Sequence, residues 1–166
     1  SGPDALLYSL DAVDWAEMDL ALYDTLVIPA DPDHSWDGDW TLYYKARDKA
    51  GLVEAQQTTS IKIDTRKPAG KAIAAVTVRR GRYATLKYKI AETGPHGPKA
   101  TGVKVTIKDR RGKVVRAFSL GTKAVNKVHA LRFRCTLPRG SYIFFVNGTD
   151  AAGNTARVGA RRLTVK

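Results

Sequence analysis

The residues best suited to chemistry are six cations at the polar positions of three alternating segments. They are Lys87, Lys89, Lys104, Lys108, Arg132 and Arg134. If the three segments are strands of one sheet, these side chains point to one face, because alternate residues of a strand share a face. Such a face would bind the phosphates or carboxylates of an anionic glycan, a cell-wall polymer or nucleic acid. The alternative is that lysine and arginine only protect exposed strands from pairing with other chains.

Nucleic acid is the least favoured of these ligands. Proteins that bind single-stranded nucleic acid stack successive bases on aromatic side chains. We identify no aromatic residue in the polar phase of the three segments. The pattern therefore favours an anionic glycan or wall polymer over nucleic acid.

A second candidate is an oxygen-rich loop at residues 33–38. Its sequence, Asp-His-Ser-Trp-Asp-Gly, places Asp33, Ser35 and Asp37 at alternate positions before a glycine, as in the first half of a calcium-binding loop. The twelfth position of such a loop is Tyr44, where a calcium loop has a bidentate glutamate. We therefore expect no cofactor, and keep Ca²⁺ in this loop as the alternative.

The sequence contains no motif that indicates catalysis. The single cysteine, Cys135, shares its phase with Leu131 and Phe133, which predicts a buried thiol that acts as a small hydrophobic group. The three histidines have no zinc-binding spacing. There is no phosphate-binding loop, nucleophile elbow or His-Glu-x-x-His motif. We predict that the chain has no catalytic residues.

A stretch that occurs twice organises the elements that carry these residues. Residues 38–51 and 140–153 both read Gly-x-aromatic, seven residues, then Asp-x-Ala-Gly, 102 residues apart. Each aromatic residue, Trp40 or Tyr142, is a candidate corner residue that anchors its strand. We interpret the Asp and Gly residues as turn formers, because glycine adopts positive φ and aspartate accepts backbone hydrogen bonds, with metal binding by the aspartates as the alternative. The turn residues are Asp48, Gly51, Asp150 and Gly153.

Charge divides the chain between the two copies. Residues 1–66 carry 5 Lys and Arg against 13 Asp and Glu, whereas residues 67–166 carry 23 against 3. The segment 64–70 contains proline and glycine where the balance changes, which indicates a linker. We predict an acidic module at 1–66 and a basic module at 67–166. Such modules attract each other, and the basic one attracts polyanions; the alternative is that the charges only solvate the surfaces.

Short alternating segments predict an all-β fold. No stretch keeps helical periodicity over ten residues, and the basic module contains about seven short strands separated by turns, which indicates an Ig-like β-sandwich. In the acidic module we expect strands at Leu6–Leu10, Thr25–Pro29, Trp40–Arg47 and Thr58–Ile63. No apolar run approaches the roughly 18 residues of a membrane span.

Two motifs resemble the tandem Ig-like modules of bacterial secreted and cell-surface proteins. Residues 150–154 read Asp-Ala-Ala-Gly-Asn and residues 64–68 read Asp-Thr-Arg-Lys-Pro, as at the end of the penultimate strand and in the linker of those repeats; Leu52 stands where Asn is usual. The resemblance implies two tandem β-sandwich modules, an extracellular or cell-surface location, and the remaining domains of a larger parent protein as partners. It also implies that the first module lacks two N-terminal strands, lost or placed on another chain. A module of about 64 residues buries only about 60% of its surface and is marginal alone.

The sequence therefore predicts a non-catalytic interaction or spacer module of a bacterial surface or secreted protein. The alternative is an accessory module, appended to an enzyme, that binds an anionic glycan or cell-wall polymer through the basic face of its second half. The two differ in retention on an anionic glycan, which falls with salt only if the basic face binds it.

Overall fold

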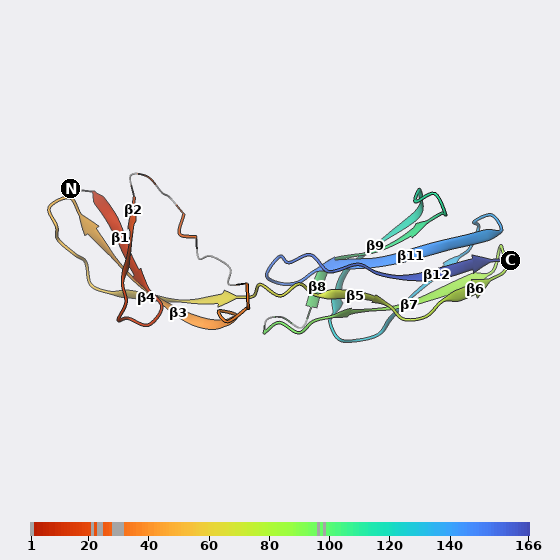
Figure 1. The fold of residues 1–166 in the computed structure, drawn as a ribbon, viewed down its shortest axis with the longest axis horizontal. Helices are drawn as coiled ribbons and strands as arrows, with labels where there is room; N and C mark the ends of the chain where they lie inside the picture. Colours follow the sequence, from red (N-terminus) through yellow and green to blue (C-terminus); the bar gives the residue numbers. More distant parts are fainter. Residues whose placement is uncertain (1, 21, 23–24, 28–31, 96, 98) are drawn as a thin grey trace. The chain divides into compact units, whose positions relative to one another are not determined.

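The computed structural model describes residues 2–20, 22, 25–27, 32–95, 97 and 99–166. Every regular element in these ranges is a β-strand, so the all-β class predicted from the alternating pattern is confirmed. The chain forms two compact units, Ser1–Asp64 and Thr65–Lys166 (Figure 1). Within the described ranges, no helix has the length and apolar character that crossing a membrane requires.

The first unit is a single antiparallel sheet. Its strands are β1 (Pro3–Ser9), β2 (Ala16–Asp19), β3 (Gly38–Asp48) and β4 (Gln57–Ile63), in the order β2-β1-β3-β4. Among its described residues, Ala5 is the only fully buried hydrophobic side chain. The sheet therefore lacks a second layer within the described residues. The strand predicted at Thr25–Pro29 lies partly outside these residues, and Thr25–Val27 form no strand.

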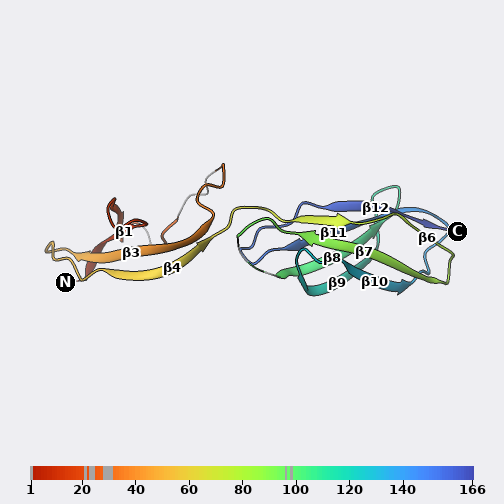
Figure 2. The ribbon, with the colours of Figure 1, turned by 90° about the horizontal axis from the view of Figure 1, so that it is seen from below.

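The second unit is a two-layer sandwich. Its strands are β5 (Ala69–Ala72), β6 (Val76–Val78), β7 (Tyr83–Ala91), β8 (Lys99–Lys108), β9 (Val114–Ala124), β10 (His129–Arg134), β11 (Gly140–Thr149) and β12 (Gly159–Val165). One sheet has the order β10-β7-β5 and the other β6-β12-β11-β8-β9. Figure 2 shows the strands of this unit from a second side. The expected count of about seven strands is one too low, because β5 lies where Pro68 and Gly70 led us to predict only a linker.

The core of the second unit lies between these two sheets. Leu86 and Ile90 of β7 belong to the same buried cluster as Val105 of β8 and Phe144 of β11, and all four are fully buried. Cys135 is also fully buried, which confirms the prediction of a thiol packed as a small hydrophobic group. Alternation of buried and exposed residues along β7 and β8 is what gives each sheet one apolar face.

Two glycines permit the close approach of β5 to β11 and β12. A Cβ atom added to Gly70 would lie 2.1 Å from the carbonyl oxygen of Val146, and one added to Gly159 would lie 2.0 Å from the carbonyl oxygen of Gly70. The Gly70 N–H also donates to the Arg157 carbonyl at 2.7 Å. Any side chain at Gly70 or Gly159 would force these backbones apart, so both positions require glycine.

The repeat extends to the pairing of the strands. The order β2-β1-β3-β4 of the first unit matches β9-β8-β11-β12 of the second. Tyr8 pairs with Tyr44 in the first unit, and Val105 pairs with Val146 at the matching position of the second. Both valines are fully buried, whereas both tyrosines are partly exposed. The difference arises because the three-stranded sheet covers the second position, with β5 and β7 in contact with β11, and no described strand covers the first.

Candidate anion-binding surface

The structure divides the six predicted anion-binding residues between two sheets. Those in the three-stranded sheet are Lys87 and Lys89 of β7 and Arg132 and Arg134 of β10. Lys104 and Lys108 lie on β8, in the five-stranded sheet. Both sheets turn their apolar faces to the shared core, so their polar faces lie on opposite sides of the sandwich. The prediction of one face made by all six residues is therefore wrong, and the reason is that alternation does not specify which strands pair.

A fifth cation joins the four on the three-stranded sheet. Lys71 of β5 lies directly opposite Lys89 of β7 in the antiparallel pairing. Opposed residues in such a pair have Cβ atoms about 4.5–5.5 Å apart, and like charges placed there are destabilising. The sequence pattern does not indicate Lys71, because Pro68 and Gly70 predict a linker up to residue 70; in the structure Gly70, Lys71 and Ala72 alternate as buried, exposed and buried.

An aromatic side chain lies among these cations. Tyr83 begins β7, is 59% exposed, and occupies the same phase as Lys87. The guanidinium of Arg132 lies 4.3 Å from the centre of the Tyr83 ring, within the range of a cation–π contact. The Arg134 Nε donates to the Gly81 carbonyl at 3.2 Å, and this hydrogen bond holds the Arg134 side chain against the turn before β7. The prediction that this phase holds no aromatic residue is therefore wrong, and extending the period by two residues from Thr85 would have found Tyr83.

We define the basic sheet face as the exposed side of β10-β7-β5. Its residues are Lys71, Tyr83, Lys87, Lys89, Arg132 and Arg134. None of its five cations forms an ion pair with any described residue. The face therefore presents concentrated positive charge without an internal counter-charge.

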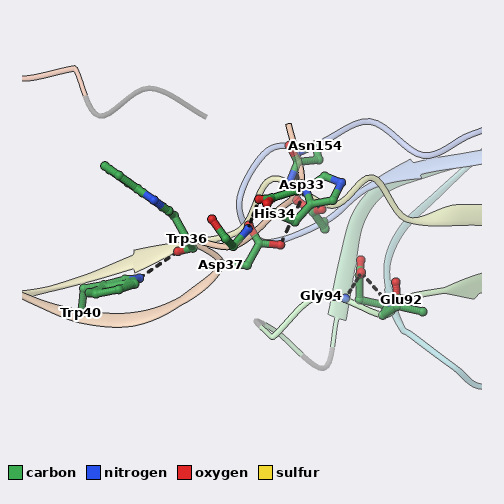
Figure 3. Close-up of polar contacts among 11 residues, drawn as sticks. Asp33, His34, Trp36, Asp37, Trp40, Glu92, Gly94 and Asn154 are labelled. Carbon is green, nitrogen blue, oxygen red and sulfur yellow. Dashed lines mark hydrogen bonds and ion pairs between the residues drawn. The ribbon is translucent and has the colours of Figure 1, made fainter. Parts of the chain in front are cut away.

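The acidic residues of the second unit are committed to turns. Glu92 accepts hydrogen bonds from the backbone N–H groups of Thr93 at 2.7 Å and Gly94 at 2.8 Å (Figure 3). Asp109 Oδ1 accepts from Arg111 and Lys113, both at 2.9 Å. The third carboxylate of residues 67–166, that of Asp150, likewise bonds within its own turn. These carboxylates stabilise loops at the ends of strands and leave the basic sheet face unneutralised.

The polar face of the five-stranded sheet has a different character. Lys108 Nζ lies 5.1 Å from the centre of the Phe145 ring, and Lys104 pairs with Asn147 across the strands. Ile143 on the same face is 44% exposed. Cations here are mixed with apolar and neutral groups, so this face is a weaker attractor of anions than the basic sheet face.

The predicted turn residues form matching hydrogen-bonded turns. Asp48 Oδ1 accepts from Ala50 and Leu52, both at 2.9 Å, and Gly51 has φ of +85°. In the second unit, Asp150 Oδ1 accepts from the Asn154 N–H at 2.8 Å and Gly153 has φ of +93°. The geometry shows both aspartates accepting from backbone N–H groups, and positive φ where glycine stands.

The aromatic residue after each repeat glycine anchors the strand that it begins. Tyr142 donates its hydroxyl hydrogen to the Pro138 carbonyl at 2.9 Å. Trp40 Nε1 donates to the Trp36 carbonyl at 2.8 Å (Figure 3). Each acceptor lies four residues before its donor. Burial raises the pKa of the Tyr142 phenol, which keeps the hydroxyl protonated as a donor.

The loop proposed for calcium is organised by its own hydrogen bonds. Asp33 Oδ1 accepts from the Ser35 N–H at 2.8 Å, and the Asp37 N–H donates to the His34 carbonyl at 3.2 Å. His34 Nδ1 lies 3.9 Å from Asp37 Oδ2 (Figure 3). In the described ranges, no group of three His, Cys, Asp or Glu side chains is arranged to hold a metal ion. Calcium binding by Asp33, Ser35 and Asp37 stays a prediction.

A hollow of about 530 Å³ in the first unit is apolar. Its lining includes Tyr8, Leu10, Trp36 and Trp40. Tyr8 and Trp40 occupy positions that match buried core residues of the second unit. The hollow is therefore the uncovered inner face of the sheet, and its aromatic rings are those of a core rather than of a ligand site.

Comparison with known proteins identifies no family. The sequence matches no protein-family profile, and no curated protein matches it. Among solved structures, fibronectin(III)-like modules of Clostridium thermocellum CbhA match all of this chain and 80% of theirs, at 12% identity and a TM-score of 0.48. The sialic acid binding region of a Streptococcus sanguinis SK1 adhesin, bound to 3'sLn, matches 99% of this chain and 66% of that chain, at 14% identity and a TM-score of 0.42. The chicken CNTN1 FN1–FN3 domains match 98% and 57%, at 11% identity and a TM-score of 0.43. At these values the fold rests on the strands and sheets described above, and no ligand or activity follows from the similarities.

Proposed function

We propose that the chain is a non-catalytic interaction module of a secreted or cell-surface protein, and that its second unit binds an anionic glycan or cell-wall polymer. The extracellular location rests on the motif resemblance of residues 64–68 and 150–154 alone. The ligand proposal rests on the basic sheet face. The observation that carries it is the cross-strand pair of Lys71 and Lys89, which forms no ion pair with a carboxylate of the residues that the structure describes.

The Lys71–Lys89 pair carries an electrostatic cost in the free protein. Two like charges directly opposite on neighbouring strands destabilise the sheet in the free protein. An anionic group placed between the two ammonium groups removes that repulsion and adds two attractions. Binding of an anion by this pair is therefore expected to be more favourable than binding by two lysines that do not repel each other. A surface that served only for solubility gains nothing from opposing its charges in this way.

The chemistry of the face favours a polymer with repeated anionic groups. Its five cations are spread over all three strands of the sheet. Single-stranded nucleic acid is disfavoured, because Tyr83 is the only aromatic residue of the face and its ring is in contact with Arg132. Stacking of successive bases requires several exposed rings.

The decisive experiment compares dextran sulfate with uncharged dextran as immobilised probes. The triple variant Lys71→Gln, Lys87→Gln and Arg132→Gln is expected to lose about 10-fold or more in affinity for dextran sulfate, on about 0.5 kcal/mol per exposed cation. The matched control is Lys104→Gln, Lys108→Gln and Arg162→Gln, which removes the same charge from the polar face of the other sheet.

The result separates site binding from general charge attraction. Equal losses in the two triple variants would show that net charge alone retains the protein, and would refute the proposal. No retention on dextran sulfate at physiological salt would leave the spacer function as the better conclusion. The bound fraction is also expected to fall steeply as salt is raised from low to physiological ionic strength.

A further inference from the structure

A second concentration of positive charge lies at one end of the sandwich. There the turn between β6 and β7, the segment before β11 and the end of β12 border an open hollow of about 860 Å³. Its lining residues are Arg79, Arg80, Gly81, Arg139 and Lys166, and we call it the arginine pocket. Four of these five residues are cationic, and the lining contains no carboxylate side chain.

The floor of the arginine pocket is held by backbone hydrogen bonds from three parts of the chain. The Arg80 N–H donates to the Lys166 carbonyl at 2.9 Å, and the Gly81 N–H to the Cys135 carbonyl at 2.7 Å. Gly81 has φ of +84°, a conformation that favours glycine. The N–H groups of Arg80 and Gly81 are used in this way, so the donors left for a ligand are chiefly those of the side chains.

The side chains of the pocket suit a tetrahedral oxyanion. A guanidinium presents several N–H donors in a planar fork that pairs bidentately with phosphate or carboxylate. A carboxylate has two oxygens and is satisfied by one or two such forks. A phosphate or sulfate monoester has three terminal oxygens and can accept from three guanidinium groups, which is the number that Arg79, Arg80 and Arg139 supply.

The arginine pocket adjoins the basic sheet face. The turn that forms its floor leads directly into Tyr83, and Arg134 Nε donates to the carbonyl of Gly81 in that turn at 3.2 Å. Lys89 lies six residues further along β7, about 20 Å at the rise of an extended strand. A polymer that enters the pocket with one anionic group can therefore continue over Arg134 and Arg132 toward Lys89 and Lys71.

We propose that the arginine pocket binds a phosphate or sulfate group of the polymer whose other anionic groups lie on the basic sheet face. This inference rests on the proposed function and narrows it: the ligand carries phosphate or sulfate groups rather than carboxylates alone. It also gives the bound polymer a direction along β7. Wall polymers with phosphomonoester groups and sulfated glycans share this chemistry.

The test uses two probes with one backbone, dextran sulfate and carboxymethyl dextran at matched charge density. The double variant Arg79→Gln and Arg139→Gln is expected to lose about 10-fold or more in affinity for dextran sulfate. For carboxymethyl dextran it is expected to lose no more than the roughly 5-fold that follows from two exposed cations at about 0.5 kcal/mol each, because a carboxylate has no third oxygen to bond. The control Arg116→Gln and Lys123→Gln removes the same charge from β9 and is expected to change neither affinity by more than 2-fold. The single variant Arg80→Gln provides a second, milder substitution, and thermal melts confirm that each variant folds.

Each outcome decides the inference. Equal loss for both probes, or no loss for either, would overturn the selectivity of the arginine pocket. Inorganic phosphate, titrated at constant ionic strength against chloride, is expected to shift the amide resonances of Arg80 and Gly81, and a lack of shift would also overturn it. If the sheet-face triple variant binds both dextrans normally while phosphate still shifts these resonances, the proposed function fails and the pocket stands alone.

Discussion

Replacing Lys89 with glutamate is expected to stabilise the second unit while it weakens polyanion binding. The substitution converts the repulsion between residues 71 and 89 into attraction, because the two lie directly opposite on β5 and β7. The same change places a negative charge at the centre of the basic sheet face. Stability and affinity should therefore move in opposite directions, which neither a purely structural nor a purely solvating role of Lys89 predicts.

The magnitude follows from the pairing geometry. Two unit charges about 6 Å apart in water interact by about 0.7 kcal/mol, and the Debye length of about 8 Å at physiological salt reduces this to roughly 0.3 kcal/mol. Changing repulsion to attraction doubles the effect, so the gain is about 0.7 kcal/mol at physiological salt. For a unit of this size such a gain raises the melting temperature by about 3–5 °C.

Thermal melts and dextran sulfate affinity are measured on the same samples at low, physiological and 1 M salt. Lys89→Gln is expected to give about half the stabilisation, and Lys71→Glu combined with Lys89→Glu is expected to return to the stability of the original protein, because like charges again oppose each other. Lys127→Glu, at an exposed loop position, measures the gain that comes only from lower net charge. A Lys89→Glu gain no larger than that of Lys127→Glu, or one that persists undiminished at 1 M salt, would refute the reasoning.

Three further substitutions or conditions test the architecture. Gly70→Ala is expected to destabilise the second unit by about 1–3 kcal/mol in urea unfolding, because the new Cβ would meet the Val146 carbonyl. Gly81→Ala, where a Cβ meets nothing within 4 Å but φ is +84°, measures the cost of backbone strain without a steric clash. Tyr142→Phe is expected to cost about 1 kcal/mol through loss of the hydrogen bond to Pro138, and an unchanged melting temperature would contradict the corner role. Thermal melts with calcium and with chelator are expected to coincide, and a reproducible rise with calcium would support binding at Asp33, Ser35 and Asp37.

The strands of the second unit were predictable because each of its sheets buries only one of its two faces. Leu86 and Ile90 alternate with Lys87 and Lys89, and this period of two follows from the geometry of an extended chain whatever its partners are. The alternation gives each residue its face and identifies the buried thiol of Cys135. The turns were equally predictable, because the aspartate of Asp-x-Ala-Gly accepts hydrogen bonds from backbone N–H groups of its own turn.

The pairing of strands was not predictable from the same pattern. Lys104 and Lys87 occupy equivalent polar phases, yet β8 and β7 belong to different sheets and the two side chains lie on opposite faces. Alternation is a local property, whereas sheet membership depends on contacts between residues far apart in sequence. β5 was missed for a related reason: Gly70 punctuates the sequence like a linker, but it stands there because β11 passes within contact of its backbone.

The two units show that burial depends on a second layer of strands as well as on the alternation of residues along one strand. Tyr44 and Val146 occupy the same register position, each beside an apolar residue of the neighbouring strand. Only Val146 is fully buried, because β7 packs over it. The same layer carries the basic sheet face on its outer side. One three-stranded sheet therefore both completes the core and presents Lys71 opposite Lys89, so substitutions on its polar side are expected to weaken the proposed polyanion binding while leaving the core side chains in place.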